Sequence, residues 1–180
     1  MTTIVATIAA NGDIHMAADV RYSDVESGAY WESEQTPKIA ARNNVAYGVA
    51  GDQQIVQHII YGWEPPYVDI LSDPMLAMHT SIMPSLREHI GDMDGEWEVL
   101  IGFNKTLFLV DKTGFTHDDR TDFAAIGSGA AYALGYMEGA IERYNNLERY
   151  LGNAIVVAAQ YNANTSRAHT LVVAEYDETF

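Results

Sequence analysis

The order of strand-like and helix-like segments limits the fold of this chain more than any single motif does. Strand-like runs are expected over residues 3–9, 14–20, 38–40, 45–50, 98–103, 106–110, 114–117, 122–126 and 168–176. Helical spacing of apolar residues follows Asp52, covers residues 76–90 and 151–165, and recurs after Gly129 with a face formed by Leu134, Met137, Ile141 and Tyr144. Strands and helices are thus segregated into runs, which predicts an α+β fold rather than alternating βαβ units. A four-layer αββα sandwich, with two antiparallel sheets between two helix pairs, would bury the apolar faces.

Turn-forming and helix-breaking residues set the expected boundaries of these elements. Asn11-Gly12-Asp13 is a strong hairpin signal between the first two strands. Residues 23–36 are polar and acidic, and we expect a loop there. Asp52 is the expected N-cap of the first helix, Pro65-Pro66 its end, and Pro84 a bend in the second helix.

The composition excludes several classes of protein. The chain has 180 residues, 48% of them apolar, which suits one domain over residues 1–180. It has no cysteine, which rules out a disulfide framework or a thiolate metal site. A formal net charge of −15 argues against a nucleic-acid partner, because phosphate binding needs a basic surface. No apolar run approaches the length of a membrane span and no signal peptide is evident, so we expect a cytoplasmic protein without a membrane partner.

The first residues of the chain offer a specific chemistry. Removal of Met1 would leave Thr2 with a hydroxyl and a free α-amine on one residue. An amine with an ordinary pKa of about 8 can take the hydroxyl proton, so such a residue serves as both nucleophile and base. Many chains begin with Met-Thr without catalysis, so the surrounding motifs decide between these interpretations.

Six short motifs occur in the order found in one family. The chain resembles the proteasome β-subunit and its bacterial HslV-type relatives, which are N-terminal-nucleophile (Ntn) hydrolases. The resemblance covers nearly the whole chain and rests on Thr2-Thr3-Ile4-Val5, Asn11-Gly12, Ala17-Ala18-Asp19-Val20-Arg21, Thr36-Pro37-Lys38-Ile39, Gly48-Val49-Ala50-Gly51-Asp52 and Ala125-Ile126-Gly127-Ser128-Gly129. It implies the Ntn hydrolase fold and a threonine peptidase.

The resemblance implies a catalytic group around Thr2. In the family, a carboxylate matching Asp19 orients the nucleophile's surroundings and pairs with a lysine matching Lys38, while an arginine matching Arg21 supports them from outside. A cation beside Thr2 would lower the pKa of its hydroxyl and help to move its proton. Taken alone, Lys38 could equally lay its aliphatic stem on the sheet, and Asp19 could form an ordinary charge pair with Arg21.

The resemblance also implies an oxyanion hole and a substrate-binding wall. The backbone amide of Gly48 would stabilise the oxyanion, and Ser128 and the amide of Gly129 would lie near the amine of Thr2, although Gly-Ser-Gly is also a common turn. The backbone of Ser23 would pair with an extended substrate. Ala46 and Ala50 would line a roomy apolar pocket with a weak preference for large apolar side chains.

Two departures from the family pattern limit what can be carried over. Proteasome β-subunits carry an aspartate after the last helix, whereas residues 160–165 hold no carboxylate here. HslV-type proteins also lack it, and some bind an alkali cation through carbonyl oxygens, for which Ala159, Asn162 and Thr165 have a compatible spacing. Carbonyl ligands leave no side-chain signature, so no cofactor is predicted. The loop over residues 23–36 is also longer than in HslV-type relatives.

The histidines do not predict a metal centre. The six of them are scattered without ligand spacing. The acidic group of Asp118, Asp119 and Asp122 beside His117 fits a solvated turn better than a metal site.

We therefore expect a threonine endopeptidase with Thr2 as nucleophile. The resemblance implies a homo-oligomer of stacked hexameric or heptameric rings, unfolded polypeptide as substrate and an ATP-dependent unfoldase as partner. The alternative is a catalytically silent ring or assembly protein that retains Met1, whose Thr2 nitrogen would remain an amide. A third possibility is a small-amide hydrolase of the same superfamily.

Overall fold

The computed structural model describes residues 2–23, 27–140 and 146–176. Its strands are β1 (Thr3–Ile8), β2 (Ile14–Asp19), β3 (Arg21–Ser23), β4 (Tyr30–Glu32), β5 (Ile39–Arg42), β6 (Val45–Gly51), β7 (Trp97–Phe103), β8 (Thr106–Asp111), β9 (Gly114–Thr116), β10 (Phe123–Gly127) and β11 (His169–Ala174). Its helices are α1 (Gln53–Gly62), α2 (Pro74–Ala77), a π-helical turn (Met78–Ile82), α3 (Met83–Ile90), α4 (Ala130–Ala140) and α5 (Leu147–Tyr161). The α+β class predicted from the segment order is confirmed.

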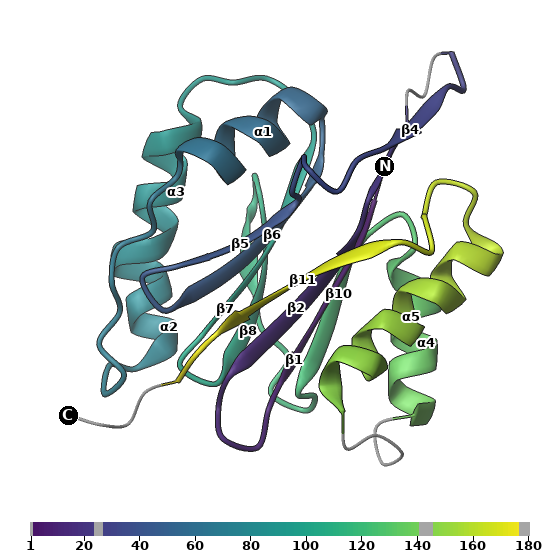
Figure 1. Cartoon of the computed structure of the whole chain (residues 1–180). Helices are drawn as coiled ribbons and strands as arrows, with labels where there is room; N and C mark the ends of the chain where they lie inside the picture. Colours follow the sequence, from purple (N-terminus) through teal and green to yellow (C-terminus); the bar gives the residue numbers. More distant parts are fainter. Residues whose placement is uncertain (1, 24–26, 141–145, 177–180) are drawn as a thin grey trace.

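Two antiparallel sheets and one short ribbon contain all the described strands. The larger sheet has the order β5-β6-β7-β8-β9, the smaller has the order β10-β1-β2-β11, and β3 pairs with β4. In Figure 1, helices α1 to α3 lie on one side of the strands and helices α4 and α5 on the other. Strand β1, which begins directly after Thr2, is a central strand between β10 and β2.

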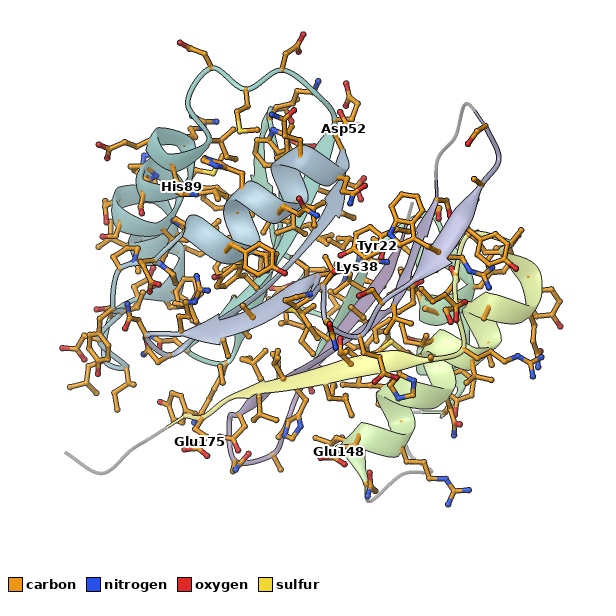
Figure 2. All side chains as sticks on the ribbon, turned by 45° about the horizontal axis from the view of Figure 1, so that its top comes forward. Tyr22, Lys38, Asp52, His89, Glu148 and Glu175 are labelled. Atoms are coloured by element: carbon orange, nitrogen blue, oxygen red, sulfur yellow. The ribbon has the colours of Figure 1, made fainter. Side chains whose placement is uncertain are left out.

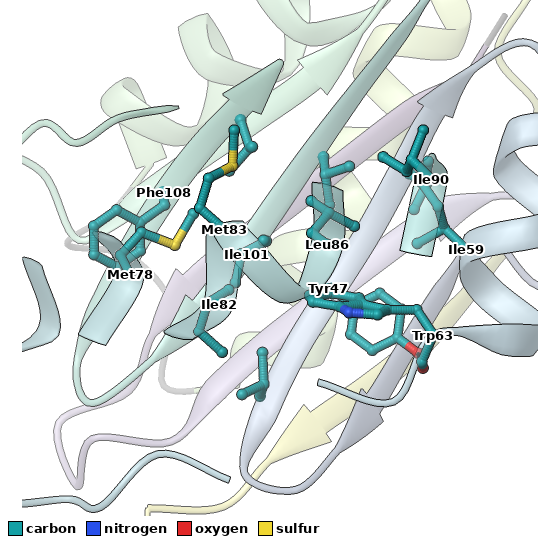
Figure 3. Close-up of a cluster of buried hydrophobic side chains, with 14 of the residues drawn as sticks. Tyr47, Ile59, Trp63, Met78, Ile82, Met83, Leu86, Ile90, Ile101 and Phe108 are labelled. Atoms are coloured by element: carbon teal, nitrogen blue, oxygen red, sulfur yellow. Dashed lines mark hydrogen bonds between the residues drawn. The ribbon is translucent and has the colours of Figure 1, made fainter. Parts of the chain in front are cut away.

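Three clusters of buried apolar side chains hold these elements together. One joins α1 and α3 to the larger sheet, and Figure 3 shows its Trp63, Tyr47 and Leu86. A second contains side chains of both sheets, such as Ile4 of β1 and Leu100 of β7. A third joins α4 and α5 to the smaller sheet. Each cluster follows the strand period of two, which sends alternate side chains to opposite faces.

The polar segment after residue 23 is not the plain loop predicted from its composition. Tyr30–Glu32 pairs with Arg21–Ser23 as an antiparallel hairpin, with Trp31 opposite Tyr22. The two rings stack with centroids 5.9 Å apart. Aromatic residues favour strands and cross-strand contact, and this preference outweighs the acidic composition around them.

Three helix predictions need correction or lie partly outside the described residues. Helix α5 begins at Leu147, not residue 151, because the side chain of Asn146 accepts the N–H of Arg149 at 2.8 Å. It ends at Tyr161. In the second helical segment, a π-helical turn precedes Pro84, where the sequence predicted a bend at Pro84 itself. Proline has no N–H to donate to the preceding turn, so the regular α-helical hydrogen bonding is interrupted there. On α4, Met137 is buried, whereas Ile141 and Tyr144 lie outside the described residues.

Asp52 takes the N-cap position of α1 as predicted, but its side chain makes no capping bond. One carboxylate oxygen instead accepts the N–H of Glu96 at 3.0 Å, which ties the start of α1 to the approach of β7. In the described residues, no helix is both long enough and apolar enough to cross a membrane.

The packing of Tyr47 under Trp63 predicts a pH effect on stability (Figure 3). The buried Tyr47 hydroxyl donates to the carbonyl oxygen of Trp63 at 3.1 Å, and burial raises the pKa of Tyr47 to about 12. Since the unfolded value is about 10, this residue's stabilisation is complete below pH 10 and is lost as the pH rises through 12.

We expect Tyr47→Phe to lower the free energy of unfolding by about 1 kcal/mol at neutral pH. The same change should flatten the loss of stability above pH 10, as measured by urea denaturation at several pH values. The exposed Tyr67 gives a matched control, because Tyr67→Phe should change neither quantity. An unchanged alkaline slope in Tyr47→Phe would contradict the assignment.

Candidate active site

Thr2, Asp19 and Lys38 meet in one hydrogen-bonded group. The Thr2 hydroxyl donates to Oδ1 of Asp19 at 2.7 Å and accepts from Nζ of Lys38 at 2.5 Å. Lys38 also donates to Oδ1 of Asp19 at 3.0 Å. The residues come from the start of β1, the end of β2 and the approach to β5, so the fold of both sheets is needed to bring them together.

The Asp19 carboxylate is 1% exposed and fully engaged. A buried charge is tolerated when partners replace its lost hydration. Its two oxygens accept five hydrogen bonds of 2.7–3.0 Å, from the Thr2 hydroxyl, the Thr3 N–H and Lys38 on Oδ1, and from the N–H groups of Arg21 and Ser166 on Oδ2. These bonds fix the carboxylate and, through it, the orientation of the Thr2 hydroxyl.

Lys38 is 3% exposed and its ammonium group is held by three acceptors. They are the Thr2 hydroxyl, Asp19 and the carbonyl oxygen of Arg21. Burial lowers the pKa of Lys38, and this effect outweighs the opposing attraction of Asp19. The Nζ atom also lies 4.8 Å from the ring centroid of Tyr22. A lysine with a lowered pKa can exchange a proton with a hydroxyl more readily than a solvated one.

Arg21 touches this group only through its backbone in the described structure. Its N–H binds Asp19 and its carbonyl binds Lys38. The guanidinium points elsewhere, donating to Glu32 at 2.8 Å and to the carbonyl of Ala163 at 2.6 Å. Arg21 therefore links the β3–β4 hairpin to the turn after α5, and its supporting role stays a prediction.

Gly127 and Gly129 allow the chain to pass close to Thr2 and Thr3. Gly127 has φ +86°, and a Cβ there would lie 2.3 Å from the carbonyl oxygen of Thr2. A Cβ on Gly129 would lie 2.1 Å from the hydroxyl of Thr3. The Ser128 hydroxyl lies 3.4 Å from the Thr2 carbonyl oxygen, a long hydrogen bond. The predicted Gly-Ser-Gly segment is thus beside Thr2.

Gly48 and Ala46 lie beneath the site rather than on its surface. A Cβ on Gly48 would lie 2.8 Å from a methyl carbon of Ile4, so this glycine permits close packing between the sheets. The N–H of Val49 donates to the backbone carbonyl oxygen of Lys38, and N–H directions alternate along a strand, so the Gly48 N–H points toward β7. Ala46 is fully buried in the same inter-sheet cluster.

A cleft of about 930 Å³ opens beside Thr2, Lys38 and Ser128. Ser23 and Ala50, two of the three residues expected to bind substrate, line this cleft. Figure 2 shows Lys38 and Tyr22 close together between the two halves of the molecule, with Asp52 at the start of α1.

Several cleft residues were not predicted from the sequence. Tyr22, Trp31, Asp52, Trp97 and Glu98 line the cleft. Their inclusion depends on the β3–β4 hairpin and on the register of β6 with β7, and no local sequence pattern signals either. The N–H of Ser166 on Asp19 was also missed, because a backbone donor carries no residue signature.

The turn after α5 and the acidic turn near His117 are held by bonds within the protein. The carbonyl of Asn162 accepts the N–H of Thr165, whose hydroxyl shares a hydrogen bond of 2.6 Å with that of Thr3. Asp118 pairs with Arg120 at 2.8 Å. Across the parts of the chain that are described, no three or more His, Cys, Asp or Glu side chains are arranged to hold a metal ion.

Comparison with solved structures identifies the fold. BPH from Thiobacillus denitrificans, solved in complex with epoxomicin, has a TM-score of 0.73 and 20% identity over 97% of this chain and 98% of that one. HslV from Trypanosoma brucei has a TM-score of 0.72 and 14% identity over 97% and 100%. An Anbu mutant from Hyphomicrobium sp. strain MC1 has a TM-score of 0.66 and 16% identity over 97% and 82%.

The resemblance to HslV-type proteins is therefore confirmed at the level of the fold. No protein-family model and no curated protein sequence matches the chain.

Proposed function

We propose that this protein is a threonine-type endopeptidase of the Ntn hydrolase kind, built on a four-layer αββα sandwich, with Thr2 as its nucleophile. The observation that carries the proposal is the contact of the Thr2 hydroxyl with both Lys38 and Asp19 at the edge of an open cleft. Burying a lysine–carboxylate pair around one hydroxyl costs desolvation energy. Activation of that hydroxyl for catalysis explains why the pair is buried there.

The reaction begins once Thr2 is the first residue of the chain. Its Oγ attacks the carbonyl carbon of a peptide bond, and its free α-amine accepts the hydroxyl proton, with Lys38 holding the oxygen. The developing oxyanion needs a hydrogen-bond donor. The Gly48 N–H, which the resemblance implies for this role, points toward β7 in the structure, so the role is not assigned to it. The tetrahedral intermediate expels the amine of the leaving peptide, which takes up the proton. Water then attacks the ester on Thr2 and releases the second product.

Removal of Met1 is the condition for this chemistry. Met1 lies outside the described residues, so its removal stays a prediction. If Met1 remains, the Thr2 nitrogen is an amide and cannot serve as a base, which is the case for a silent ring or assembly protein. The retained hydrogen-bonded group of Thr2, Asp19 and Lys38 favours the enzyme, since an assembly role requires none of them together.

We further propose that the enzyme acts as stacked hexameric or heptameric rings on unfolded polypeptides, with an ATP-dependent unfoldase as partner. The support is the fold shared with HslV-type proteins. Native mass spectrometry of the purified protein would count the subunits. A monomer with full peptidase activity would contradict the ring.

The decisive experiment combines intact mass with an epoxyketone such as epoxomicin, which requires both a hydroxyl and a free amine on one residue. We expect the mass to show loss of Met1 and the reagent to add once, on Thr2, with loss of hydrolysis of fluorogenic peptides. A chain that retains Met1, forms no adduct and hydrolyses no peptide would overturn the proposal.

A further inference from the structure

The cleft beside Thr2 has a negative wall. Asp52, Glu96 and Glu98 line it, and among the described lining residues Lys38 is the one cationic side chain. The ammonium of Lys38 is already committed to Thr2, Asp19 and the Arg21 carbonyl. An arriving ligand therefore meets carboxylates without a free cation beside them in this lining.

Glu98 has the most direct position relative to the nucleophile. In the antiparallel register of β6 and β7, Glu98 lies opposite Ala50, so the two side chains emerge on the same face. This face carries Leu100 and packs against Ile4 of β1, the strand that begins directly after Thr2. Glu98 is thus the outermost residue of that face, where the packed core ends and the cleft opens.

A hydrogen bond fixes Glu98 against the strand end beside Thr2. Its Oε2 accepts the N–H of Gly127 at 3.1 Å. Gly127 pairs with Thr3 in the β1–β10 ladder and closely approaches the Thr2 carbonyl. Gly127 therefore lies between the Glu98 carboxylate and Thr2. The side chain of Glu98 is exposed and lines the cleft.

The other two carboxylates of the wall are engaged by the protein itself. Oδ2 of Asp52 accepts the N–H of Glu96 at 3.0 Å, and Glu96 pairs with Lys112 at 2.6 Å. Asp52 adds negative potential to the cleft, whereas the charge of Glu96 is offset by Lys112, and neither is the principal contact. Ser23 also lines the cleft, and its hydroxyl oxygen is buried and has no hydrogen-bond partner within the described residues. A buried unpartnered hydroxyl points to a ligand that supplies the missing bond.

We propose that Glu98 makes this cleft selective for substrates with a cationic side chain, lysine or arginine, next to the scissile bond. The proposal rests on the function proposed above. It replaces the weak apolar preference expected from Ala46 and Ala50, since Ala46 is buried under the cleft and Glu98 stands beside Ala50. The gain comes from pairing a carboxylate with a cation in a partly desolvated cleft, and from repelling acidic side chains.

Four fluorogenic peptides that differ in one residue before the cleaved bond test the selectivity. With Arg, Lys, Leu or Glu at that position, we expect kcat/KM to be at least tenfold higher for Arg and Lys than for Leu, and lowest for Glu. The advantage should shrink as salt is raised, because screening weakens charge pairing. A preference for Leu over Arg at low salt would overturn the proposal.

Glu98→Gln removes the charge and keeps an oxygen that can accept the Gly127 N–H. We expect this variant to lose most of its Arg-over-Leu ratio, with kcat/KM for both peptides measured on the same variant so that any general loss of activity cancels. Glu148→Gln is the matched control, since Glu148 lies on α5 far from Lys38 in Figure 2. An unchanged ratio in Glu98→Gln, or an equal loss in Glu148→Gln, would contradict the role of Glu98.

A binding measurement separates failure of this inference from failure of the proposed function. Calorimetry with Thr2→Ala, which cannot turn over, would compare uncleaved Arg and Leu peptide amides. Tighter binding of the Arg peptide that depends on Glu98 supports the selectivity even if no hydrolysis is found. Equal or weaker binding overturns it even if the wild-type protein is an active peptidase.

Discussion

Thr2→Ala is expected to remove peptide hydrolysis, with a loss of about four to six orders of magnitude in kcat. The Oγ1 atom is the proposed nucleophile, and in the structure it is the atom that both Lys38 and Asp19 contact. Thr2→Ser keeps the hydroxyl and should retain measurable turnover, at a reduced rate because the methyl group that restricts the rotamer is gone. Initial rates with a fluorogenic peptide would measure both variants.

Loss of activity in Thr2→Ala should not reflect loss of the fold. Lys38 and Asp19 pair directly at 3.0 Å, so we expect this ion pair to persist in Thr2→Ala and the thermal unfolding midpoint to change little. Thr80→Ala, on an exposed helical position, provides a matched loss of one threonine hydroxyl and should be fully active. Hydrolysis that survives Thr2→Ala would show that the nucleophile is misassigned.

Lys38→Met is expected to lower kcat by about a thousandfold or more and also to destabilise the protein. Methionine retains the buried stem but offers no charge, so Asp19 is left with backbone and hydroxyl donors alone. Breaking one partner of a buried ion pair typically costs about 3–5 kcal/mol. Kinetics well below the unfolding midpoint would separate the two effects, with unfolding followed by circular dichroism.

Lys112→Met is the control for Lys38→Met. Lys112 forms an exposed ion pair with Glu96, and exposed pairs contribute little to stability. We expect this variant to keep both its activity and its unfolding midpoint. Full activity of folded Lys38→Met would mean that the α-amine of Thr2 needs no lysine beside it.

The sequence predicted the parts of the fold that depend on local pattern. The Asn11-Gly12-Asp13 turn, the meander of β7 to β9 and the segregation of strands and helices all follow from turn residues and apolar periodicity. The β3–β4 hairpin was missed because the contacts that join its strands, Tyr22 with Trp31 and Arg21 with Glu32, have no turn or periodicity signal in an acidic segment. The start of α5 was misplaced because Asn146 was not recognised as its cap.

Only those site residues that belong to the family motifs could be predicted from the sequence. Thr2, Asp19 and Lys38 were identified through family motifs, and the structure brings them together. Glu98 lines the cleft because it pairs with Ala50 in the β6–β7 ladder. The two residues are 48 positions apart in the sequence, so no local pattern specifies this pairing. Gly48 and Ala46 matched family positions in sequence, yet alternation along β6 turns them toward the inter-sheet core.

The five donors on Asp19 also determine when the active centre can first exist. They include Thr3 and Ser166, so one carboxylate joins the beginning of the described chain to the approach of its last strand. Contacts between residues so distant along the chain form late, because a large loop must close first. A partly folded chain in which β11 has not docked would therefore lack the Ser166 donor on Asp19. Recovery of the proposed peptide hydrolysis during refolding would then follow the docking of β11.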